Sequence, residues 1–166
     1  MFYTDQRFMK VAGPFINHRE FQKMKKIPHH NDSVYDHVLN VAYQAYRVSY
    51  KKGWDWESTI RGALLHDFYL YQFNKKPRWS LLIDAYNHMV NHPLKAYENA
   101  SKHFHLNPIE KDIIISHMFP VRVPKYKESW IVSLMDKSLA IIEYSQKFKK
   151  VVLGYEEKEE SYQKAQ

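Results

Sequence analysis

The chain has 166 residues, of which 45% are hydrophobic and 16% aromatic, so it is long enough to bury the core of one domain without staples. Cysteine is absent, which excludes disulfides and thiolate metal ligands and fits a cytoplasmic protein. The sequence contains no run of about 18 apolar residues, and residues 1–16 lack the pattern of a secretory signal, so no membrane partner is expected.

The formal net charge of +7 indicates a surface that attracts phosphates in nucleic acids, nucleotides or lipid headgroups. The basic residues form short clusters, which are more typical of solvated helix faces than of a dedicated binding patch. The sign reverses near the end of the sequence, so residues 153–166 are predicted to form an acidic, frayed tail.

The first part of the chain, residues 1–27, is the least informative. Its apolar residues after Pro14 predict one stripe of a short helix, and residues 28–32 predict a loop. The residues of the stripe are Phe15, Ile16, Phe21, Met24 and Ile27.

A long helix is predicted next, because Ser33 and Asp36 form a start that resembles a capping box. Its apolar face continues to about Tyr50, and Gly53 ends it. His37 lies on this face, one turn from the start.

A second helix is predicted from its cap at Asp55 to about Phe68. Gly62 and its small neighbour in the middle of this helix would let another helix approach closely.

The next segment is polar and basic over residues 73–80 and predicts a loop, followed by a short helical piece over residues 81–88. Because proline is favoured at the first position of a helix, Pro93 predicts a new helix to about Phe104. His92 would then lie next to its N-cap.

The clearest helix start is Asn107-Pro108-Ile109-Glu110, with asparagine at the N-cap and glutamate three residues later. This helix is predicted to end at about His117. A final helix is predicted over residues 128–152, with an inward face made of Trp130, Leu134, Ser138, Ile141 and Ile142.

No strand-like alternation is sustained anywhere, and the chain has neither repeats nor a linker. These patterns predict an all-α fold, a compact bundle of about six to eight helices. Residues 1–166 are expected to form a single domain with its core over residues 33–152.

His66 and Asp67 end the apolar run of the second helix. The pair alone would more readily mark the point where a buried helix meets solvent. However, the chain carries four further donors, one upstream and three downstream, each within its own predicted helix: His37, His92, His117 and Asp136. Oxygen and nitrogen donors on successive helices are what a two-metal site needs.

Asp67 is the expected bridge of such a site, because a carboxylate offers two oxygens whereas an imidazole offers one nitrogen to one cation. The other donors divide into His37, His66 and Asp136 for one cation, and His92 and His117 for the other.

The ordered set of donors resembles the HD-domain superfamily of metal-dependent phosphohydrolases, whose signature is a doublet like His66-Asp67. The resemblance covers about residues 33–143. The additional His92 and His117 make the chain similar to the branch that binds two metals. Small bacterial single-domain members are similar over residues 62–71 and 92–100.

The resemblance implies a helical fold and hydrolysis of phosphate esters or anhydrides with divalent metals, about two per chain. Fe, Mn, Co, Ni or Zn suit imidazole and carboxylate ligands. Two cations lower the pKa of a water from near 15.7 toward roughly 7, and the resulting hydroxide would attack phosphorus. Asp67 and His66 are the predicted catalytic residues.

The chain departs from many HD enzymes, which carry a small residue and a lysine after the doublet, whereas residues 68–71 are Phe, Tyr, Leu and Tyr. A basic group that contacts the substrate must therefore come from elsewhere. The candidates are Lys137, Arg122, Lys125 and His30.

The leading hypothesis is a phosphohydrolase acting on a small phosphorylated substrate, a nucleotide or a dinucleotide, with nucleic acid not expected as a partner. The alternative is a non-catalytic helical module that binds nucleotide or nucleic acid. A third interpretation is that the metals are structural and hold the helices together. The sequence leaves the oligomeric state open.

Overall fold

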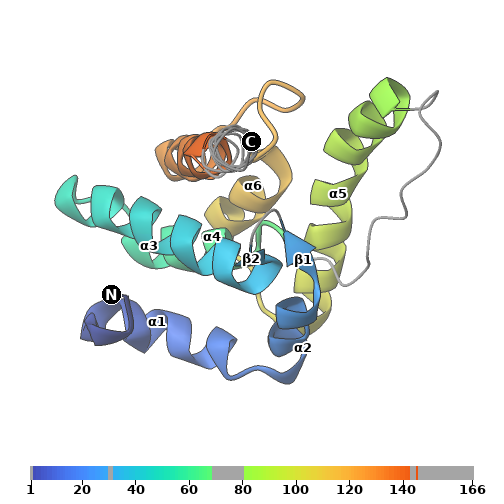
Figure 1. Cartoon of the computed structure of the whole chain (residues 1–166). Coiled ribbons are helices and arrows are strands. Elements are labelled where there is room, and N and C mark those ends of the chain that lie inside the picture. The colour runs from blue at the N-terminus through green and yellow to red at the C-terminus, as the bar shows by residue number, and fades with distance from the viewer. Residues whose placement is uncertain (1, 30–31, 69–80, 143–144, 146–166) are drawn as a thin grey trace, which may run out of the picture.

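The computed structural model describes residues 2–29, 32–68, 81–142 and 145, and helices dominate it (Figure 1). The all-α prediction is confirmed. The predicted tail over residues 153–166 and the predicted loop over residues 73–80 lie outside the described residues. The helices are η1 (Phe2–Thr4), α1 (Gln6–Ile16), α2 (Arg19–Gln22), η2 (Lys23–Lys26), α3 (Val34–Lys51), α4 (Trp56–Leu65), α5 (Leu81–His103), α6 (Pro108–Ser116) and the C-terminal helix over residues 127–142.

The helix starts follow from their capping residues, as predicted. Ser33 caps α3, and its side chain accepts a hydrogen bond from the backbone N–H of Asp36. Asp55 caps α4 in the same way. Asn107 and Glu110 form the reciprocal capping box of α6, which satisfies two backbone N–H groups that the helix leaves unpaired.

Helix α4 is central, because it packs against α1, α3, α5 and α6 (Figure 1). The predicted close approach is confirmed at Gly62. A Cβ atom added at this glycine would lie 2.6 Å from Cδ1 of Ile113 in α6. The missing side chain therefore brings α4 and α6 together, and the first residues beyond both helices, His66 and His117, lie near one another.

The N-terminal part differs from the single helix predicted after Pro14. Helix α1 begins earlier, where the Asp5 side chain accepts from the backbone N–H groups of Arg7 and Phe8, and it contains Pro14. The chain turns at Asn17 and continues as α2 and η2. The predicted apolar residues are nevertheless all buried.

The predicted loop over residues 28–32 contains a short antiparallel pair. Strands β1 (Pro28–His29) and β2 (Asp32–Ser33) are two residues long each, and His29 pairs with Asp32. The strand β2 ends at the N-cap of α3, so this pair delivers the chain to the helix that carries His37.

The predicted break before Pro93 is wrong, because α5 runs without interruption from Leu81 to His103. A proline inside a helix removes one backbone hydrogen bond, so other contacts must hold the helix together. His92, Pro93, Ala96 and Ala100 are buried, and this packed side continues across the proline. His92 therefore lies inside a helix and not at its start.

The predicted inward face of the final helix is also wrong. Leu134 and Ile141 are 56% and 68% exposed, and Trp130 and Ile142 are exposed as well. The buried residues of this helix lie on another side, with Asp136 one turn further along: Glu128, Ser129, Ile131, Val132 and Ser133. This buried side contains polar residues because the Ser129 hydroxyl donates to Asp112 in α6 and the Ser133 hydroxyl donates to the carbonyl of His117. A prediction from hydrophobicity alone therefore selects the wrong side of the helix.

Among the described residues, no helix combines the length and the hydropathy that crossing a membrane requires.

Candidate metal centre

The six predicted donors converge where α3, α4, α5, α6 and the C-terminal helix meet. Asp136, whose side chain is 15% exposed, is the only one of the six that is not buried. The buried donors are His37 in α3, His66 and Asp67 at the end of α4, His92 in α5 and His117 at the end of α6.

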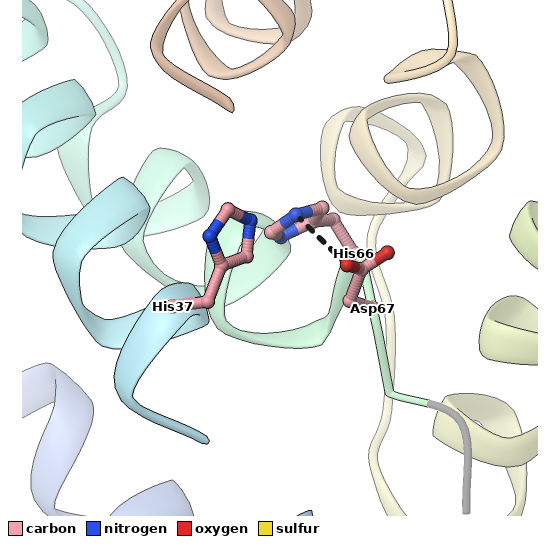
Figure 2. Close-up of side chains that lie close together, drawn as sticks. All are labelled: His37, His66 and Asp67. Atoms are coloured by element: carbon pink, nitrogen blue, oxygen red, sulfur yellow. Dashed lines mark ion pairs between the residues drawn. The ribbon is translucent and has the colours of Figure 1, made fainter. Parts of the chain in front are cut away.

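Figure 2 shows His37, His66 and Asp67 together, with the imidazole ring of His37 next to that of His66 and tilted against it, at a distance of 5.6 Å between ring centroids. Nε2 of His66 lies 3.7 Å from Oδ2 of Asp67. The donor atoms of these three side chains all lie within 4.8 Å of one another, a spacing that one cation can span.

A second group of donors shares Asp67. Its Oδ1 lies 3.0 Å from Nε2 of His92 and 3.5 Å from Nε2 of His117. These donor atoms also lie within 4.8 Å of one another. Asp67 thus presents one oxygen to His66 and the other to His92 and His117, which is the arrangement expected of a bridging carboxylate.

Asp136 closes the first group from the side of the C-terminal helix. Its Oδ1 lies 3.0 Å from Nε2 of His37 and 3.7 Å from Nε2 of His66. The first group therefore has two imidazoles and two carboxylates around it, and the second has two imidazoles and one shared carboxylate.

The two helix-ending histidines are held by the same local geometry. His66 is the C-cap of α4, and its Nδ1–H donates to the Ala63 carbonyl over 2.6 Å. His117 is the C-cap of α6, and its Nδ1–H donates to the Ile114 carbonyl over 2.8 Å. Each bond fixes the tautomer so that Nε2 is left to face the site, as is usual for metal-binding histidines.

Two polar side chains of the C-terminal helix hold the backbone of His117. The Ser133 hydroxyl donates to the His117 carbonyl over 2.6 Å, and the Lys137 ammonium donates to the same oxygen over 2.9 Å. Sequence reasoning missed Ser133. The signal that could have found it is its position three residues before Asp136, on the same side of a helix.

The donor set fits divalent metal ions. Nε2 of His66 is fully buried and has no hydrogen-bond partner among the described residues, although burying such an atom alone is costly. Nε2 atoms of His92 and His117 lie only 2.8 Å apart. Buried nitrogens and carboxylate oxygens that point at common spaces satisfy one another only when a proton or a cation is shared.

The electrostatics of the site favour positive charge. Burial disfavours the charged form of His66, but the carboxylates of Asp67 and Asp136 outweigh it and raise the pKa of His66 to about 9. Burial and the charge of His66 lower the pKa of His117 to about 3. Burial works against ionisation of Asp67 and Asp136, yet the surrounding histidines lower the pKa of both carboxyls. The metal-free site therefore holds a proton where a cation would bind.

The metal-free protein is expected to be most stable near pH 6.5. Above that pH the folded protein keeps a proton on His66 that the unfolded chain releases, so stability is lost as the pH rises toward about 9. Below it the unfolded chain protonates His117 but the folded protein does not, so stability falls toward pH 3. Urea unfolding of chelator-treated protein across this range measures both slopes.

Single substitutions distinguish the contributions of His66 and His117 to the pH dependence of the free energy of unfolding. His66→Gln is expected to reduce the alkaline slope and His117→Gln the acidic one. His105→Gln, which changes an exposed histidine outside the site, should leave both unchanged. A free energy of unfolding that keeps rising between pH 6.5 and about 9 would contradict the assignment of His66.

The predicted substrate contacts are placed differently from the metal donors. Lys137 lies beside the site but is half-buried against the His117 carbonyl, and burial lowers its pKa. Arg122 and Lys125 line a pocket whose described walls include none of the six donors. His30 lies outside the described residues. Contact of these four residues with a substrate stays a prediction.

Residues 34–141 match the HD domain family. The match covers more than half of the chain and includes all six donors, so the chain belongs to the HD domain family, whose members are typically metal-dependent phosphohydrolases. No curated protein and no solved structure gives a significant match. The expected membership in the HD superfamily is confirmed, and two buried groups of histidine and aspartate are consistent with its metal site.

Proposed function

We propose that the protein is a metal-dependent phosphohydrolase that cleaves a phosphate ester or anhydride of a small molecule, a nucleotide or a dinucleotide. The observation that carries the proposal is the position of Asp67, whose two oxygens face two separate sets of buried imidazoles. A non-catalytic binding module has no need for such a divided carboxylate. The net charge of +7 supports an anionic substrate.

In this proposal His37, His66 and Asp136 would hold one divalent cation, His92 and His117 would hold the other, and Asp67 would contribute to both. When bound, such ions supply Lewis acidity, which lowers the pKa of water and offsets charge on phosphoryl oxygens. Fe, Mn, Co, Ni and Zn all suit these ligands.

The chain itself supplies orientation and proton control. The carbonyls of Ala63 and Ile114 keep Nδ1–H on His66 and His117, so the opposite nitrogens stay directed into the site. Asp67 is kept ionised by the neighbouring histidines, and this carboxylate would orient a water toward phosphorus. The buried donors exclude bulk water, which strengthens each of these interactions.

The test is metal content combined with turnover. Protein purified without chelators is expected to contain about two transition-metal ions per chain, and to release phosphate from an aryl phosphate and from members of a nucleotide panel. Chelation should abolish turnover, and adding the metal back should restore it. The matched control is His105→Ala, which removes an exposed imidazole outside the site and should change neither quantity.

Two outcomes would contradict the proposal. Protein that stays metal-free after reconstitution and hydrolyses nothing would favour the binding module. Unchanged turnover after complete metal removal would exclude the metal-dependent mechanism while leaving family membership intact.

A further inference from the structure

A pocket with a volume of about 550 Å³ lies between α6 and the segment of residues 122–126. That volume is typical of sites for small ligands. Its wall includes the basic residues Lys111, Arg122 and Lys125, the ring of Tyr126 and the apolar side chain of Ile115.

The pocket and the metal centre are on opposite sides of α6. Successive residues of an α-helix are turned by about 100°, so Lys111, Asp112 and Ile115 share one side of α6. Ile113 and His117 then share the opposite side. The packing agrees with this geometry, because Ile113 faces Gly62 of α4 and His117 faces the buried donors. A ligand in the pocket is therefore not a ligand of the metal centre.

The pocket has an excess of positive charge. Its acidic member, Asp112, is already engaged, since its Oδ2 accepts from the backbone N–H of Lys125 over 2.9 Å and from the Ser129 hydroxyl over 2.6 Å. The same oxygen accepts from the backbone N–H of Tyr126 over 3.3 Å. The Asp112 carboxylate therefore holds the backbone of residues 125–126 in place. The side chains of Arg122 and Lys125 are exposed.

The rim also carries groups that suit a planar ring. Tyr126 offers an aromatic face, and Ile115 and Val123 offer apolar surface beside it. The Lys111 ammonium already makes a cation–π contact, because its Nζ lies 5.1 Å from the ring centroid of Tyr97. Arg122 and Lys125 are then the cations available to a phosphate, and an exposed guanidinium binds phosphate through two parallel N–H donors.

We propose that this pocket is a second ligand site, separate from the metal centre, that binds a phosphorylated small molecule with an aromatic ring, such as a nucleoside monophosphate. This inference goes beyond the proposed function and does not depend on it. The segment of residues 122–126 begins five residues after His117, so a ligand here would contact the connection between one candidate metal ligand and the C-terminal helix.

Isothermal titration calorimetry with AMP, in the presence of EDTA, tests the proposal on the full chain. AMP is expected to bind, and the double variant Arg122→Ala/Lys125→Ala should weaken binding by at least about tenfold, because two charge-assisted contacts are lost. Inorganic phosphate should bind at least about tenfold more weakly than AMP, because it lacks the ring.

Two further variants locate the bound AMP. Lys127→Ala removes an exposed lysine that does not line the pocket and lies 5.4 Å from the ring of Trp54, so AMP binding should persist. Asp67→Asn changes the metal centre and should also leave AMP binding unchanged. Binding that survives Arg122→Ala/Lys125→Ala, or that is lost in Asp67→Asn, would overturn the proposal, as would equal affinity for AMP and phosphate. The metal content and turnover that test the proposed function are measured separately, so the absence of AMP binding at this pocket would not contradict that function.

Discussion

Replacing Asp67 by asparagine is expected to reduce the metal content to at most one ion per chain and to abolish hydrolysis. Asparagine keeps one acceptor oxygen but replaces the other with an NH₂ donor, so it cannot face both imidazole sets with negative charge. The loss of turnover should exceed the 10–100-fold typical of removing a group that only supports a metal ligand. Metal analysis, phosphate release and circular dichroism on the same sample measure the effect.

The control for Asp67→Asn is Glu98→Gln, which makes the same change from carboxylate to amide on an exposed part of α5. Glu98 pairs with Lys102 over 2.7 Å at the surface, and such pairs contribute little. This variant should keep its metal and its turnover. If Asp67→Asn retained both metals and full activity, the bridging role of Asp67 would be excluded.

Replacing Gly62 by alanine is expected to lower the free energy of unfolding by about 3 kcal/mol, the upper range for overpacking a core. The new Cβ would lie 2.6 Å from Cδ1 and 2.9 Å from Cβ of Ile113. Rotation of Ile113 can move its Cδ1 but not its Cβ, so α4 and α6 must separate. Because His66 and His117 end these helices, metal content should fall together with stability. Urea unfolding and metal analysis check both effects.

The same substitution at Gly13 provides the control. Gly13 lies in α1, and a Cβ atom added there would meet nothing within 4 Å. Alanine is favoured over glycine in helices by about 1 kcal/mol, so Gly13→Ala should raise stability slightly. Equal effects of the two substitutions would show that α4 and α6 are not held at the distance that Gly62 sets.

Much of this architecture was predictable because local signals determine it. The capping box at Asn107 and Glu110 depends only on residues within one turn, so it is readable in the sequence. The convergence of the six donors was predictable for a different reason, a resemblance and not a local pattern. Donors such as His37 and Asp136 follow one another in an order that resembles a known family, even though 99 residues separate them and only packing brings them together.

The failures occurred where contacts between helices override local preference. Pro93 predicts a helix start, but its helix is held across the proline by a buried side that no local pattern reveals. The C-terminal helix turns Ser133 inward because its hydroxyl has a partner at the His117 carbonyl, whereas Leu134 is left exposed. This partner is the C-cap residue of another helix, α6, so the pattern of a single helix cannot predict it.

The pair of histidines that cap α4 and α6 ties the direction of each donor to the length of its helix. Deleting one residue inside α4 would turn His66 by about 100° and shift it by about 1.5 Å along the axis, which removes its nitrogen from the site. A deletion inside α6 would do the same to His117. Insertions between the helices carry no such penalty. Over evolutionary time, changes in chain length should therefore accumulate in the connections and be absent from the helices that these histidines end.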